Sequence, residues 1–198
     1  MSELELDALT ELVNIGVSRA AANLAVMCHE PVTLTVPAIS TVTPEQAAEM
    51  IGGARVGKMV AVEQGYVGDV SGRALLIFPE VNSLELVRAV AGEDVAAQDI
   101  PAIAPEALLE TGNIVLQSCL GTLANMLQGQ LDISTPKLVE GPAREIFPRV
   151  AKDGVLFVYI NFTLRGRRIR GYIALLMELA ALGALKRLVS EFVRRETE

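Results

Sequence analysis

Apolar residues recur every three or four positions along the first part of the chain, and this spacing is the period of an amphipathic helix. Residues 32–36 then alternate between apolar and polar side chains, as in a half-buried strand, and Pro37 ends the alternation. The pattern therefore predicts a helix of about 20 residues followed by a short strand. The helical positions are Leu6, Leu9, Val13, Val17, Ala20 and Leu24.

The same order of patterns occurs in both halves of the chain. A less regular stretch over residues 38–56 precedes two predicted strands and a helix, and Leu131 and Ile133 later repeat the alternation of the short strand. Each half is therefore predicted to contain a helix, a strand, a variable segment, two strands and a helix. The later strands and helices are predicted at 58–67, 72–79 and 81–90, and then at 155–164, 168–177 and 179–195.

The two halves also match residue by residue at a constant offset of 99. Residues 7–40 align with residues 106–139 without a gap, and nine of the 34 positions are identical. Because one offset relates so many positions, we predict an internal duplication with repeats of about 1–99 and 100–198. The identities include Glu11 with Glu110, Asn14 with Asn113 and Pro37 with Pro136.

A repeat of this size is not expected to fold alone, because half a sheet would leave an open edge and too small a core. We therefore predict one α+β domain over residues 1–198, in which the two repeats share one sheet around a pseudo-twofold axis. The hydrophobic content of 51% supports a densely packed core, and because Trp is absent the core must be filled mainly by Ala, Leu and Val.

Polar residues form a stripe along each of the two long predicted helices, because residues three and four apart lie on one helix face. A solvated helix face is the simplest interpretation of such a stripe. Asn, however, is a mediocre helix former, and Asn14 and Asn113 lie too deep in their helices to act as caps. Their recurrence beside an acid therefore favours a functional face. The stripes are Asp7, Glu11, Asn14 and Ser18, and Glu106, Glu110, Asn113 and Gln117.

The charge of the chain argues against several classes of partner. A net charge of −7 provides no basic surface for nucleic acid, and the basic run at 165–171 is interpreted as a solvated strand or turn. The N-terminus is acidic where a signal peptide would be basic, and the apolar stretch 173–185 is short and interrupted by Glu178. We therefore expect a cytoplasmic protein that does not insert into membranes.

Candidate chemistry other than the repeated motif is sparse. Cys28 and Cys119 lie in apolar helical segments and are expected to be reduced thiols that fill space. His29 is the only histidine and is expected at a helix end, so neither a zinc site nor a Ser-His-Asp arrangement can be assembled. The glycine-rich signatures of nucleotide-binding loops are also absent. We therefore predict no cofactor or metal site of the chain's own.

Taken with its proline 23 residues after each Asn, the doubled Glu-x-x-Asn motif resembles the signature of the CheC family of chemotaxis phosphatases, which includes CheX and the N-terminal part of FliY. The stretches ELVNIGVSRAAANLA and SGRALLIFPE resemble sequence segments of the same family, and the resemblance covers essentially the whole chain. Asp7 fits the family pattern four residues before Glu11, whereas Glu106 departs from it conservatively.

The resemblance implies a substrate, the aspartyl-phosphate of the response regulator CheY. It implies that Glu11 and Glu110 form ion pairs with the regulator's lysine and that Asn14 and Asn113 orient the attacking water. Mg²⁺ is expected in the regulator's own site, and the deamidase CheD is an expected partner. A non-catalytic adaptor that binds phosphorylated CheY or CheD remains the alternative, because the related FliM domain works by docking without the motif.

Overall fold

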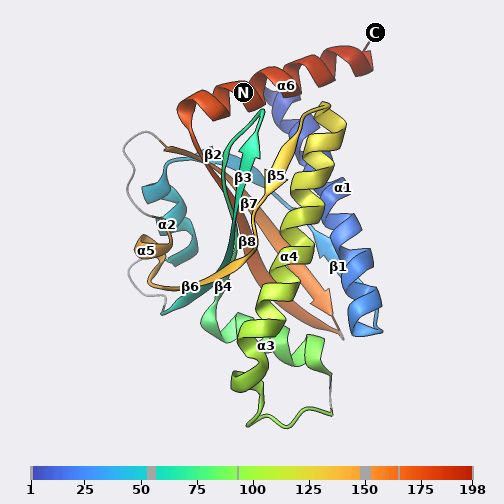
Figure 1. Cartoon of the computed structure of the whole chain (residues 1–198), viewed down its shortest axis with the longest axis vertical. Coiled ribbons are helices and arrows are strands. Elements are labelled where there is room, and N and C mark those ends of the chain that lie inside the picture. The colour runs from blue at the N-terminus through green and yellow to red at the C-terminus, as the bar shows by residue number, and fades with distance from the viewer. Residues whose placement is uncertain (1, 53–56, 93, 148–152, 165, 198) are drawn as a thin grey trace.

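The computed structural model describes residues 2–52, 57–92, 94–147, 153–164 and 166–197, and Figure 1 shows their arrangement. The predicted α+β class is confirmed: these residues form an eight-stranded antiparallel sheet with helices on both faces. In the first half the elements are α1 (Glu3–Cys28), β1 (Val32–Thr35), β2 (Ile39–Val42), α2 (Pro44–Gly52), β3 (Met59–Gly68), β4 (Gly72–Pro79) and α3 (Glu80–Ala91).

The second half contains the same order of elements. They are α4 (Ile100–Leu127), β5 (Leu131–Ile133), β6 (Lys137–Gly141), α5 (Ala143–Ile146), β7 (Asp153–Leu164), β8 (Arg167–Glu178) and α6 (Leu179–Thr197).

Two differences from the predicted elements have local causes. Helix α1 has 26 residues instead of about 20, because Ser2 and Glu5 form a capping box that starts it early. The stretch 38–56, expected to be variable, contains β2 and α2 in the part that the structure describes. Helix α2 is also started by reciprocal bonds, since Thr43 and Gln46 each accept from the other's backbone N–H.

The edge strands of each half pair with the other half. The main strand order is β1-β7-β8-β4-β3-β5, while β2 pairs with β7 and β6 pairs with β3. Strands β4 and β8 meet in the centre, where Leu75 lies opposite Ala174, its own equivalent at the offset of 99. This arrangement has the pseudo-twofold form expected of a duplication, and the duplication itself stays an inference from the sequence.

Both faces of the sheet are buried, so the molecule has two apolar layers. Alternate residues of β3 show this division: Val60 and Val62 face the long helices, and Met59 and Ala61 face the short ones. The long helices α1, α3, α4 and α6 cover the first face, and α2 and α5 cover part of the second. The site described below lies on the side of the long helices.

Helices α1 and α4 run side by side in opposite directions (Figure 1). A Cβ atom on Gly16 would lie 2.9 Å from the Cα of Cys119, so the two helix backbones approach each other closely at this point. A Cβ atom on Gly112 would lie 2.5 Å from the Cβ of Val62, so α4 also lies directly on β3. These two glycines allow α4 to be held between α1 and the sheet.

The predictions for the remaining sequence features agree with the described residues. Cys28 and Cys119 are buried and form no disulfide, and burial raises the pKa of the Cys119 thiol to about 12. His29 ends α1 in the left-handed conformation with φ 53°, and its equivalent Gln128 ends α4 at φ 57°. In the basic run, the turn and start of β8 expose Arg167, Arg168 and Arg170, while Arg165 lies outside the described residues.

Candidate functional site

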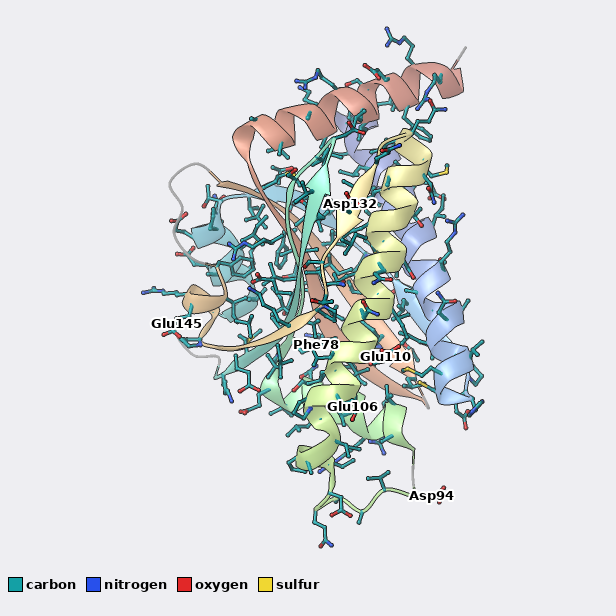
Figure 2. The ribbon with its side chains drawn as sticks, in the orientation of Figure 1. Phe78, Asp94, Glu106, Glu110, Asp132 and Glu145 are labelled. Carbon is teal, nitrogen blue, oxygen red and sulfur yellow. The ribbon has the colours of Figure 1, made fainter. Side chains whose placement is uncertain are left out.

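The outward faces of α1 and α4 carry the two predicted polar stripes. Glu11 and Glu110 are exposed, whereas Asn14 and Asn113 are only half-buried and lie in the middle of their helices. Figure 2 shows Glu106 and Glu110 in succession along α4. The apolar residues on the opposite faces of both helices enter the core, and this burial fixes which side chains point outward.

A hydrogen-bond network holds Asn113. Its Oδ1 accepts a bond of 3.1 Å from Nε2 of Gln64 and one of 2.8 Å from Nε2 of Gln117. Gln117 is one turn further along α4 and is exposed, while Gln64 rises from β3 below the helix and is fully buried. With both bonds made to its oxygen, Asn113 has its Nδ2 group left to donate.

The orientation of the Gln64 amide is fixed by its other contact. Its Nε2 also donates to the backbone carbonyl of Ser134 at 2.9 Å, and a carbonyl can only accept. The nitrogen must therefore face Ser134 and Asn113, and consequently Asn113 must present its oxygen to Gln64. The Oε1 of Gln64 is buried and has no hydrogen-bond partner among the described residues.

Asn14 has no comparable support. Its side chain makes no hydrogen bond to any residue that the structure describes, although Asn14 occupies the equivalent position in α1. The two Glu-Asn pairs thus lie on neighbouring helices, and no hydrogen bond or ion pair joins one to the other within the described part of the chain. The sequence predicts two similar half-sites, and the structure gives them different surroundings.

A groove of about 650 Å³ opens beside Glu110. Pro136, the second of the repeated prolines, lies in its wall, in the break between β5 and β6. The groove therefore brings two members of the second motif together, with an apolar floor and an acidic rim. Its lining includes Met27, Val90, Pro105, Glu106, Leu109, Glu110 and Pro136.

Gln64 is the site residue that sequence reasoning missed. It stands in the run VAVEQGYV, whose other members mark an ordinary strand, and its partners are 49 and 70 residues away in the chain. The adjacent Glu63 points to the opposite face, where its buried carboxylate pairs with Lys137 at 3.0 Å and Arg73 at 3.5 Å. Two consecutive polar residues within an apolar strand were the only signal available.

The described residues contain neither a metal-binding cluster nor a membrane-spanning helix. No three side chains of His, Cys, Asp or Glu gather there in a way that could hold a metal ion. Among the described helices, none combines the length and the apolar character that crossing a bilayer would require.

Comparison with known proteins gives consistent relatives, although no family model matches the chain. The CheY-P phosphatase CheC of Bacillus subtilis is 26% identical over 159 residues, which is 79% of this chain and 74% of CheC. The flagellar motor switch phosphatase FliY of the same organism is 27% identical over 202 residues. That match covers 100% of this chain and 51% of FliY, so the chain spans about half the length of that relative.

Solved structures show the same fold at low sequence identity. FliY of Thermotoga maritima has a TM-score of 0.77 at 17% identity, covering 97% of this chain and 98% of that one. The FliM middle domain of H. pylori has a TM-score of 0.63 at 9% identity, with coverage of 95% and 99%. The chain is thus similar in sequence to the phosphatases CheC and FliY, and it has the fold that FliY shares with the FliM middle domain.

Proposed function

We propose that the chain is a phosphatase that hydrolyses the aspartyl-phosphate of a CheY-type response regulator. In this proposal Asn14 and Asn113 position the attacking water, and Glu11 and Glu110 anchor the regulator's lysine. The observation that supports it most is a surface Glu-Asn pair whose amide, on Asn113, is held from below by Gln64. The names of the relatives point the same way, since CheC and FliY are both described as phosphatases.

The proposed reaction requires little catalytic chemistry from this protein itself. An acyl phosphate has a good leaving group, and the regulator's own Mg²⁺ can neutralise the developing charge, so the missing part is a water in line with the phosphorus. An amide suits this role because it can donate and accept hydrogen bonds, and because it adds no negative charge beside the phosphoryl oxygens. No cofactor of the chain's own enters the proposal.

The two glutamates are proposed to contribute docking. Their exposed carboxylates lie one helical turn before each Asn, on the same face. A lysine of the regulator that reached Glu110 would bring the phosphorylated site over Asn113. At the second half-site, the exposed Gln117 bond to Asn113 can be exchanged for water, while the buried Gln64 bond keeps the amide in place.

The alternative function is a binding module for the phosphorylated regulator or for CheD. The fold shared with the FliM middle domain favours it, since the family resemblance implies that the related FliM domain works by docking without the motif. A pure docking domain would, however, have no use for a positioned amide at the surface. We also propose CheD as a partner from the family resemblance, without assigning it a surface.

The test is the decay of phosphorylated regulator in the presence of Mg²⁺, followed with the wild type, Asn14→Ala, Asn113→Ala and the double variant. Each single variant should lose part of the acceleration, and the double variant should lose all of it while still binding the regulator. Asn23→Ala and Asn125→Ala are matched controls, because both are exposed asparagines on the same helices outside the motif. Absence of acceleration by the wild type, even with CheD added, would favour the adaptor.

A further inference from the structure

The sheet register shows which residue of the first half-site corresponds to Gln64. Ile133 of β5 lies opposite Tyr66, and Leu34 of β1, its equivalent at the offset of 99, lies opposite Phe162. Tyr66 and Phe162 therefore occupy corresponding positions on β3 and β7. Two residues before each of them along the strand stand Gln64 and Ile160. The pairing with β4 and β8 at the same offset instead places Val158 at the position of Gln64, and Val158 is also apolar and buried.

Ile160 shows that this position does not require a polar side chain for packing. It is buried with 1% exposure in the same apolar layer below the long helices. Gln64, by contrast, is buried with its Oε1 unpartnered among the described residues, an arrangement that disfavours folding. An apolar residue would therefore be the better choice for stability, and the Gln64 amide needs another explanation.

We propose that Gln64 is a positioning residue that makes the Asn113 half-site the faster of the two. This inference rests on the proposed function and adds a difference between its two sites. Gln64 holds the Asn113 oxygen at 3.1 Å and thereby fixes the plane of the amide that faces the regulator. Asn14 has no such hydrogen bond to a described residue, so it must order its side chain during each turnover, and this ordering opposes the reaction.

The experiment isolates each half-site before Gln64 is changed. Asn14→Ala leaves only the Asn113 site, and Asn113→Ala leaves only the Asn14 site. Gln64→Met keeps the length of the side chain and removes its amide, and Gln64→Leu is a second apolar replacement should the first fold poorly. In the Asn14→Ala background, Gln64→Met should lower kcat roughly tenfold and leave KM unchanged, because docking through Glu110 is untouched.

Three controls distinguish positioning from a general effect on the fold. Gln64→Met should leave the rate in the Asn113→Ala background unchanged. Its thermal unfolding midpoint should equal or exceed that of the wild type, since an unpartnered buried oxygen is removed. By NMR relaxation, the side-chain amide of Asn113 should be more ordered than that of Asn14 in the free protein and should lose that order in Gln64→Met.

The outcomes separate the two proposals. If the wild type accelerates dephosphorylation but Gln64→Met leaves the Asn14→Ala background unaffected, the positioning role is wrong and the phosphatase stands. Equal losses in both backgrounds would also overturn it, because they would indicate damage to the fold. If the wild type does not accelerate dephosphorylation, the proposed phosphatase activity is wrong, and so is the proposed difference in rate between the two half-sites.

Discussion

Replacing Gly112 with alanine should loosen the contact between α4 and the sheet. The new Cβ would lie 2.5 Å from Cβ and 2.5 Å from Cγ1 of Val62, whereas carbon atoms normally approach to about 3.5–4.0 Å. Helix α4 or strand β3 must therefore shift by roughly 1 Å to accept the methyl group. Overpacking of this kind costs about 1–3 kcal/mol, and about 1 kcal/mol is offset because alanine favours a helix over glycine.

The net expectation is that Gly112→Ala lowers the free energy of unfolding by up to about 2 kcal/mol, measured by urea denaturation. Gly121→Ala on the same helix is the matched control, because a Cβ there meets no described atom within 4 Å. It should raise the free energy of unfolding by up to about 1 kcal/mol. Adding Val62→Ala to Gly112→Ala should relieve the clash and give a favourable coupling of about 0.5–3 kcal/mol.

The same shift should reach the candidate site. Asn113 follows Gly112 in α4, and a displacement of the helix would stretch the bond of 3.1 Å from Gln64 beyond hydrogen-bonding range. Gly112→Ala is therefore expected to slow dephosphorylation by the Asn113 half-site at temperatures where the protein remains folded. If Gly112→Ala stabilises the protein as much as Gly121→Ala does, the close approach of α4 to β3 is refuted.

Three further predictions test charge and burial. Glu11→Lys combined with Glu110→Lys should weaken binding of the phosphorylated regulator in a titration, because like charges would then face its lysine; unchanged affinity would remove the anchor role. Cys119, buried with its pKa raised to about 12, should resist a thiol reagent at pH 8 in the native protein and react only after unfolding. Ser190 donates a hydrogen bond that lowers the pKa of Glu5, so this bond stabilises the fold above the ordinary pKa of Glu5 and is lost as pH falls through the lowered value. Ser190→Ala should therefore be less stable than the wild type at neutral pH and equally stable in strong acid, by thermal denaturation at each pH; a difference that persists in acid would contradict this.

The periodicity of the sequence was sufficient to predict most of the fold. The long helices and strands β3, β4, β7 and β8 follow from apolar spacing, which is set locally by which face each element buries. The short elements β2, α2, β6 and α5 were missed because four to nine residues carry too few repeats of a period to be recognised. The pairing of edge strands with the opposite half depends on tertiary packing, which the spacing along one strand does not encode.

The candidate site, too, could be predicted only in part from the sequence. The positions of Glu11, Asn14, Glu110 and Asn113 on exposed helix faces follow from helical spacing and the repeat. The role of Gln64 could not be predicted, because it depends on β3 passing under α4 at the level of Asn113. The sequence also could not show that Asn113 and its equivalent Asn14 have different surroundings, because the difference arises from the residues that fold against each helix.

Because the edge strands of each half pair with the other half, neither half contains a complete sheet. Cut between α3 and α4, the chain would give two fragments, each with a central hairpin whose outer edge has no covering strand and whose missing strands lie on the other fragment. Neither fragment should fold alone, and the two should recombine in a concentration-dependent way, as the subunits of a strand-swapped dimer do. The covalent connection turns that bimolecular assembly into a single folding event. It therefore lets the sequences of the two halves diverge while the halves still assemble with each other.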